Sequence, residues 1–405
     1  MQKAFQKIIG IFILLFVFTF PFPYKILPDV GGFVSPFFES IIKWIGDNIF
    51  FIQKPYTVFL SSDSTGLYIH TLILFLCSFI LGFLWYYRWR EHSKSKIFVD
   101  FIYLFCRYYL ALQMFIYGFN KVFKWQFYLP EPNTLFTRLG DISPDLLYWS
   151  TMGLSRPYTI FAGLMEIVPA ILLLFRRTQL LGAILLFLVL ANVWMINLSF
   201  DISVKLYSSF LLLITAYLIA PYLKVLRAFF QGKMVTLGAI EFSWKPFIVD
   251  KWNKIFKIII ILFFVVETFW QYIEMGNFND DKAPRPYLHG AYQVHTFVKN
   301  KDTLAVNHTE TWKHFFVHRR GYFIVQFDSE NMQDYKLEVD SSRKTFKLTR
   351  EIDKKEMIFQ YQIVEDKNIK VSGIIEKDTF LIEAKKLDLS KMPALQKSFH
   401  WRVDE

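Results

Sequence analysis

The chain has 405 residues, of which 54% are hydrophobic and 19% aromatic, and its formal net charge is +11. Soluble proteins average about 25% charged residues; here the share is 20%, and the chain has 46 phenylalanines. Many of the positive charges lie at the ends of apolar runs, where such charges orient helices in a membrane. The composition therefore indicates an integral membrane protein and argues against a nucleic-acid-binding one.

Seven apolar segments are long enough to cross a bilayer, which takes about 20 residues at 1.5 Å each. They are Ile8–Leu27, Leu67–Tyr87, Phe98–Phe119, Pro157–Phe175, Gln179–Leu198, Val204–Tyr222 and Ile255–Met275. With the N-terminus inside, the inner segments hold about twice as many Lys and Arg residues as the outer loops, as the positive-inside rule requires. The pattern predicts a bacterial inner (cytoplasmic) membrane protein with a cytoplasmic N-terminus and a periplasmic C-terminal domain.

Two of the outer loops contain short helices. Ser35-Pro36 has the cap-then-proline form of a helix start, and charged residues then recur every four positions among apolar ones. These charged residues are Glu39, Lys43 and Asp47. Such an amphipathic helix is expected to lie in the plane of the membrane interface. Ser143-Pro144 opens a second short helix, over Asp145–Met152.

From Pro284 onward, apolar and polar residues alternate with a period of two, which is typical of antiparallel strands. The predicted strands are Ala291–Phe297, Trp312–Val317, Tyr322–Phe327, Tyr335–Asp340, Thr345–Arg350, Met357–Ile363, Ile369–Ile375 and Phe380–Lys385. Closing this meander into a barrel removes its exposed edges. The architecture is lipocalin-like by analogy, and the interior either holds a small apolar ligand or is filled by its own side chains.

The predicted fold class is thus a membrane all-α protein with a C-terminal antiparallel β-barrel domain. Four parts are expected along the chain. They are residues 1–97, with two transmembrane helices and the interfacial helix; 98–222, a four-helix membrane bundle; 223–283, a cytoplasmic loop and the seventh span; and 284–405, the extracytoplasmic β-barrel domain.

Arg107 and Glu166 are the clearest anomalies, because each lies about ten residues into an apolar span. An isolated charge at that depth costs several kcal/mol, whereas an arginine and a carboxylate on adjacent helices satisfy one another. We therefore expect Arg107 and Glu166 to pair. The pair either fixes the helix register or forms the polar floor of a ligand or proton site.

Further polar residues extend from this level toward the outer surface. They are Tyr117 and Lys121 on the third span, Asn192 and Asn197 on the fifth, and Asp201 and Lys205 at the outer end of the fifth. Together these residues are candidates to line an outward-opening pocket, although an Asn within a span is as often a contact between helices. Glu267 is another intramembrane carboxylate, and the sequence does not indicate its partner.

No metal site is expected. His308, His314 and His318 lie near one another in the sequence, but in a strand His314 and His318 would be about 13 Å apart. The spans lack the internal histidines that usually hold a membrane haem. The familiar nucleotide-binding, serine-hydrolase and zinc-protease motifs are also absent from the sequence.

Four segments resemble DoxX-like membrane proteins. They are the run Arg107–Lys121, then Gly163–Glu166, Leu172–Arg176 and Asn192–Lys205, within roughly residues 98–222. The resemblance implies a four-helix membrane bundle in which Arg107, Lys121 and Glu166 are the best matched polar positions. DoxX itself is a subunit of a thiosulfate:quinone oxidoreductase, whereas related bundles act as a receptor chaperone and a cargo receptor. This chain departs from the family in its extra helices, its β domain and its lack of a C-x-x-C pair.

Three functions remain open. The first is an envelope accessory or assembly factor that binds a lipidic ligand or a partner protein. The second is a membrane subunit of a quinone-linked oxidoreductase, with a quinone as the candidate ligand near Arg107 and Tyr117. The third is a proton-coupled transporter that uses Arg107, Glu166 and Glu267, although no paired repeat of the kind common in transporters is present.

Overall fold

The computed structural model describes residues 2–88, 93–236, 250–304, 311–364, 367–375, 377–396 and 402. The chain divides into two compact units. The helical unit comprises Met1–Gln126 and Pro157–Asp280, and the barrel unit comprises Phe127–Arg156 and Asp281–Glu405. The segment between the third and fourth predicted spans therefore belongs to the barrel unit rather than to the bundle.

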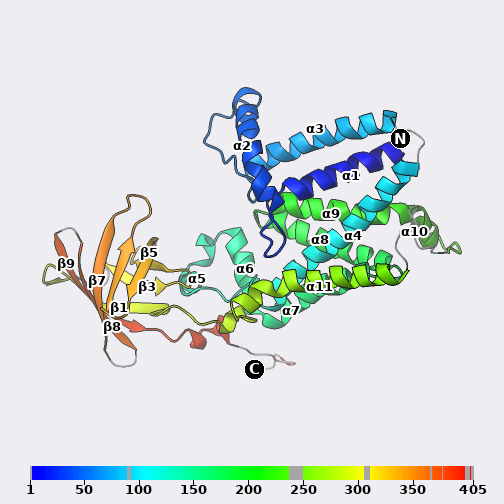
Figure 1. The fold of residues 1–405 in the computed structure, drawn as a ribbon. Helices are drawn as coiled ribbons and strands as arrows, with labels where there is room; N and C mark the ends of the chain where they lie inside the picture. Colours follow the sequence, from blue (N-terminus) through cyan, green and yellow to red (C-terminus); the bar gives the residue numbers. More distant parts are fainter. Residues whose placement is uncertain are drawn as a thin grey trace. The chain divides into compact units, whose positions relative to one another are not determined.

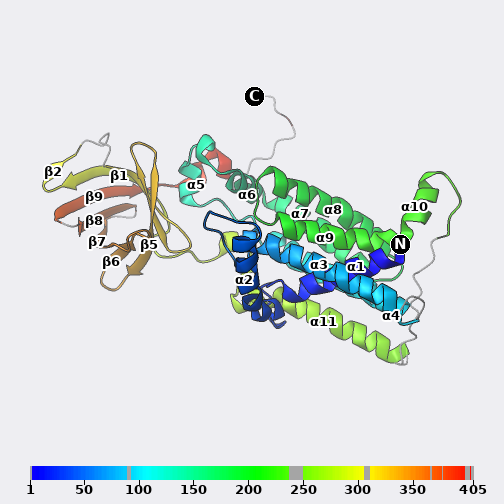
Figure 2. The ribbon, with the colours of Figure 1, turned by 90° about the horizontal axis from the view of Figure 1, so that it is seen from above.

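Most helices of the helical unit run roughly alongside one another, whereas α2 crosses the ends of α1 and α3 (Figures 1 and 2). The helices are α1 (Gln2–Thr19), α2 (Val30–Asn48), α3 (Thr65–Arg88), α4 (Ser93–Val122), α7 (Arg156–Leu173), α8 (Gln179–Ser199), α9 (Lys205–Ile219), α10 (Leu223–Phe230) and α11 (Asp250–Glu274). The core centres on α4, whose Leu110, Ala111 and Met114 are buried against side chains of its neighbours.

Five helices of the described chain are long and apolar enough to span a membrane. They are Thr65–Trp85, Lys96–Val122, Arg156–Leu173, Gln179–Ser199 and Lys205–Phe230. The apolar part of α1, Phe5–Thr19, is shorter than these five helices, and α11 is not among them. The helical membrane character is thus confirmed, while the count of seven spans stays a prediction.

Two predicted helix ends are wrong. The first helix stops at Thr19 rather than Leu27, because Pro21 and Pro23 follow and proline does not continue a helix. Helix α2 begins at Val30, where the Asp29 carboxylate accepts a hydrogen bond from the Gly32 N–H at 2.7 Å.

Ser35-Pro36 therefore lies inside α2 instead of starting it. Pro36 has no N–H to donate to the carbonyl of Gly32 four residues earlier. The Ser35 hydroxyl donates to that carbonyl at 3.2 Å and replaces the missing bond. The second outer helix, α6 (Pro144–Leu154), begins after Ser143 as predicted.

Helices α4 and α7 cross at two glycines. A Cβ atom on Gly163 would lie 2.5 Å from the Gly118 carbonyl oxygen, and one on Gly118 would lie 2.9 Å from the Gly163 carbonyl oxygen. Only glycine permits this backbone approach, as in other tightly packed membrane helices. Helix α7 then meets α8 closely, with Gly182 beside the carbonyl of Pro169.

The barrel unit contains one closed antiparallel sheet in which each strand pairs with the next, as predicted. Its main strands are β1 (Gly290–Lys299), β3 (Trp312–Val317), β4 (Tyr322–Phe327), β5 (Met332–Asp340), β6 (Thr345–Thr349), β7 (Glu356–Val364), β8 (Asn368–Ile375) and β9 (Asp378–Lys386). The two-residue strand β2 (Asp302–Thr303) pairs only with the end of β1. Pairing of β1 with β9, from Tyr292–Lys386 to Lys299–Phe380, closes the barrel. The predicted barrel is confirmed.

Aromatic rings fill the barrel interior. Their centroids are 4.6 Å apart for Tyr292 and Phe315, 5.0 Å for Phe315 and Phe323, 5.4 Å for Phe323 and Phe346, and 5.3 Å for Phe346 and Phe359. All five of these residues are buried. The interior is therefore a packed core, which settles the question that the sequence left open.

We expect Phe359→Ala to destabilise the barrel by about 3–5 kcal/mol, because it leaves a cavity among packed rings. Ile358→Ala is the matched control, because Ile358 precedes Phe359 in the same strand but its side chain points outward and is 61% exposed. Hydrogen exchange of the full-length protein should rise across β6, β7 and β8 in the first variant only. Equal exchange in the two variants would contradict a filled interior.

Candidate functional site

Glu166 pairs with Lys121 and not, as predicted, with Arg107. The Lys121 ammonium donates to both Glu166 carboxylate oxygens, at 2.9 and 2.8 Å. The side chains of Lys121 and Glu166 are 8% and 3% exposed. Both members of the pair are thus buried, and each neutralises the other.

The glycine crossing explains this pairing. Lys121 follows Gly118 by three residues and Glu166 follows Gly163 by three, so both side chains lie about one turn from the contact between α4 and α7. Arg107 lies 14 residues before Lys121 on the same helix, a distance of about 21 Å. Arg107 and Glu166 lie equally deep in their apolar runs, but equal depth did not indicate which charged side chains face each other.

Arg107 belongs to a separate buried group. Its guanidinium donates to the side-chain oxygen of Gln179 at 2.7 Å, and the Gln179 amide donates to the Tyr222 hydroxyl at 3.0 Å. This chain of hydrogen bonds links α4, the start of α8 and the turn after α9. Arg107 therefore has a neutral partner in place of the expected carboxylate.

A cluster of tyrosines lies between these two groups along α4. The hydroxyls of Tyr109 and Tyr207 are 3.0 Å apart, and Gln113 donates to the Tyr24 hydroxyl at 2.8 Å. Tyr117 lies beside the pair at the crossing, with the Lys121 ammonium 5.7 Å from its ring centroid. The polar residues of α4 are thus mostly engaged with neighbouring helices.

Glu267 holds the segment between α1 and α2. Its carboxylate accepts hydrogen bonds from the backbone N–H groups of Lys25, Ile26 and Leu27, at 2.5, 2.9 and 2.9 Å. Glu267 is 3% exposed. The carboxylate whose partner the sequence did not indicate therefore ties α11 to the chain that follows α1.

The remaining predicted pocket residues do not gather at one place. Asn192 is exposed, whereas Asn197 is buried and its amide nitrogen has no hydrogen-bond partner in the described part of the chain. At the start of α9, the Lys205 ammonium is 2.7 Å from Asp201 and 3.6 Å from Asp63. The structure thus divides the predicted outward-opening pocket into separate contacts.

An apolar groove lies on the helical unit, between α1, α3 and α4. Its volume is about 610 Å³. Its lining consists of Ile11, Leu14 and Leu15 on α1, Leu81, Leu84, Trp85, Tyr87 and Arg88 on α3, and Phe98 on α4. Arg88, in the last turn of α3, is the charged residue among these side chains. The groove is open, so the structure offers an apolar surface here and not an enclosed polar site.

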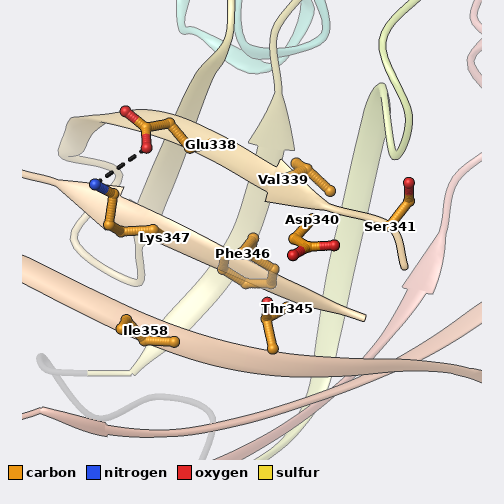
Figure 3. Close-up of a pocket in the computed structure, with 8 residues that line it drawn as sticks. All are labelled: Glu338, Val339, Asp340, Ser341, Thr345, Phe346, Lys347 and Ile358. Carbon is orange, nitrogen blue, oxygen red and sulfur yellow. Dashed lines mark ion pairs between the residues drawn. The ribbon is translucent and has the colours of Figure 1, made fainter. Parts of the chain in front are cut away.

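A second depression, of about 520 Å³, lies on the outside of the barrel at the β5–β6 hairpin (Figure 3). The Glu338 carboxylate at this site is 3.1 Å from the Lys347 ammonium on the neighbouring strand. Asp340 accepts hydrogen bonds from the backbone of Ser342 and Arg343 at the turn, each at 3.0 Å. The charged groups that line it are therefore engaged within the hairpin.

Glu131 is a buried carboxylate of the barrel unit that the sequence pattern did not indicate. It lies before α5 (Pro132–Phe136) and accepts hydrogen bonds from the Arg319 side chain and, at 3.0 Å, from the Arg319 backbone. The Nε2 atoms of His289 and His318 are 3.2 and 3.8 Å from it. The Arg319 guanidinium also lies 4.1 Å from the Tyr128 ring centroid. These contacts hold the Phe127–Arg156 segment on the barrel.

Burial is the largest influence on the Glu131 carboxyl and raises its pKa. The hydrogen bond from His289 and the charge of Arg319 together outweigh burial and lower the pKa to about 2. Burial also lowers the pKa of His318, although Glu131 acts in the opposite direction. Glu131 therefore stays ionised over a wide pH range.

One signal in the sequence could have indicated this docking. In β3 the consecutive apolar residues Phe315, Phe316 and Val317 interrupt the alternation seen in β5 and β7, and all three are buried. A strand that is apolar on both faces is covered on both faces. Outside the barrel, the Phe136 ring of α5 lies 5.3 Å from that of Phe316.

Among the described residues, no group of three or more His, Cys, Asp or Glu side chains could hold a metal ion. His314 bonds to Gln326 at 2.9 Å, His318 faces Glu131, and His308 lies outside the described residues. The chemistry that the described sites offer is apolar contact and paired charge.

Membrane-length apolar helices joined to a filled β-barrel define the class: a helical membrane protein with a barrel unit. The chain is 32% identical over 122 residues to the "Uncharacterized protein YwoB" of Bacillus subtilis (strain 168), a match to 28% of this chain and 71% of that protein. The chain therefore belongs to the family of YwoB. No family model matches the sequence, and no solved structure matches it. The resemblance to DoxX stays a prediction.

We expect Glu131→Gln to loosen the docked segment by about 3 kcal/mol, because Arg319 loses its buried ionic partner. Hydrogen exchange should rise in α5 and α6. Glu338→Gln is the control, because Glu338 pairs with Lys347 on the neighbouring strand, outside the docked segment, and exposed ion pairs of this kind contribute little. The docking account fails if both variants leave α5 and α6 equally protected.

The same contact should depend on pH. Since the pKa of Glu131 is lowered to about 2, its contribution to stability is complete above the ordinary glutamate pKa. That contribution is lost as the pH falls toward 2, because the unfolded state then binds more protons. The Glu131→Gln variant should lose this part of the pH dependence.

Proposed function

We propose that the protein is a multi-pass inner-membrane protein that binds a lipidic ligand as an accessory or assembly factor of the cell envelope. The observation that carries this proposal is the groove between α1, α3 and α4, which has almost entirely apolar walls and one arginine. Its apolar lining suits an acyl chain, and Arg88 adds a positive charge, which favours an anionic headgroup.

Specific binding in a bilayer cannot come from the hydrophobic effect alone, since lipid tails are as apolar as the groove. It requires close packing of the chain against shaped walls and recognition of the headgroup. Trp85 and Phe98 give the groove such walls, and Arg88 contributes charge. We therefore favour an anionic phospholipid as the ligand.

The proposed membrane topology follows from the fact that two separate chain segments make up the barrel unit. Its two segments, Phe127–Arg156 and Asp281–Glu405, form one compact unit, so both leave the membrane on the same side. The chain between them must cross the bilayer an even number of times. Helices α7, α8 and α9 account for three crossings, and α11 would supply the fourth. The distribution of Lys and Arg supports the periplasm as that side in our proposal.

The quinone-linked alternative is less well supported. A quinone bound by both Arg107 and Tyr117 would have to reach side chains ten residues apart, about 15 Å along α4. Arg107 is bonded to Gln179, and Tyr117 lies beside the Lys121 ammonium. A transporter that moves protons through Glu166 would first have to break the contact with Lys121.

The proposal is tested by a bulky substitution that fills the groove. Leu84→Trp should lower the occupancy of phosphatidylglycerol, measured by native mass spectrometry after gentle extraction, several-fold relative to the unchanged protein. Leu76→Trp is the control, because Leu76 is an exposed residue of the same helix that does not line the groove. Equal occupancy in the two variants would overturn the proposal for this groove.

A further inference from the structure

Helix α2 has three distinct faces along its length. One face is buried and includes Gly31, Ile42 and Gly46. A second face is polar and exposed, with Lys43 and Asp47 paired at 3.1 Å. The third face is exposed and apolar, and we name it the aromatic stripe. It consists of Val30, Phe33, Phe37 and Trp44, which are 41%, 88%, 69% and 59% exposed.

The buried face fixes how the helix is turned. Gly46 lies so close to Tyr56 that a Cβ atom would be 2.3 Å from the Tyr56 hydroxyl, and that hydroxyl donates to Asp47 at 2.8 Å. On the inner side, the Phe38 ring lies 4.7 Å from the His70 ring of α3. The aromatic stripe cannot turn inward without breaking these contacts.

The aromatic stripe and the polar face lie on adjacent sides of α2. At 100° per residue, Phe33, Phe37 and Trp44 fall within a sector of about 40°. Residues Ser40, Lys43 and Asp47 form the neighbouring polar sector, and all three are exposed. A helix with one face on protein, one apolar face and one charged face matches the environment at the edge of a bilayer.

The position of α2 in the helical unit supports this match. The helix crosses the ends of α1 and α3 instead of continuing along them (Figures 1 and 2). Helix α3 exposes large apolar residues along its length, among them Leu72, Phe75 and Phe79. The helix that carries the stripe is thus followed in the chain by a helix with an exposed apolar surface. Ile49, Phe50 and Phe51, which follow α2 directly, are also exposed.

We propose that the aromatic stripe of α2 inserts into the membrane leaflet at this end of the helices, at the level of the lipid headgroups. Tryptophan favours that level, where its apolar ring meets polar surroundings, and phenylalanine is typical of the apolar face of helices that lie there. The Lys43–Asp47 pair then faces water. The stripe anchors the outer end of α1 and α3 in the leaflet independently of any ligand in the groove.

The test compares two positions on this one helix. In a Cys77→Ser background, an environment-sensitive fluorophore is attached at Phe37→Cys or at Lys43→Cys, and the full-length protein is placed in phosphatidylcholine–phosphatidylglycerol nanodiscs. Cys106 is buried and is left in place. Quenching is measured with a lipid that carries a nitroxide near its headgroup and, separately, with iodide in water.

The stripe should place position 37 in lipid, so the nitroxide lipid should quench it several-fold more than position 43, and iodide should show the reverse order. Equal quenching by iodide at both positions would show that the stripe faces water and would overturn the proposal. Protection of position 37 from both quenchers would show that protein covers it and would also overturn the proposal.

Discussion

The ammonium of Lys121 and the carboxylate of Glu166 meet where α4 and α7 touch backbone to backbone. In an apolar interior, neither charge persists alone without a cost of several kcal/mol, so the two helices must keep this register. Gly118 and Gly163 make the register sterically possible, because any side chain there would separate the helices. Gly182 then brings α8 against the Pro169 carbonyl of α7, so close backbone packing continues into the next helix.

The barrel unit depends on a second carboxylate in an analogous way. Glu131 joins a segment between two helices to a strand end 188 residues further along the sequence. The barrel is therefore covered on one side by chain that also connects two membrane helices. Since aromatic rings fill its interior, the barrel supplies surface rather than an internal cavity.

Local periodicity predicted the elements well. The eight main strands lie where the sequence predicted them, and α6 begins after Ser143 as Ser143-Pro144 indicated. Pairings between distant segments were not predictable, because an apolar run gives the depth of a charge but not the direction it faces. Arg107 was thus assigned to Glu166, although Gln179 is its partner. Glu131 gave no local signal, and the apolar run Phe315–Val317 indicated only that both faces of β3 are covered.

The most direct test of the account is a double-mutant cycle on the buried pair. Lys121→Met and Glu166→Met should each lower the thermal stability of the detergent-solubilised protein strongly, because each leaves one unpaired buried charge, a cost of about 3–5 kcal/mol. The double variant should recover most of the loss, since it leaves no charge behind. Losses that simply add in the double variant would show that the two groups do not stabilise each other and would contradict the account.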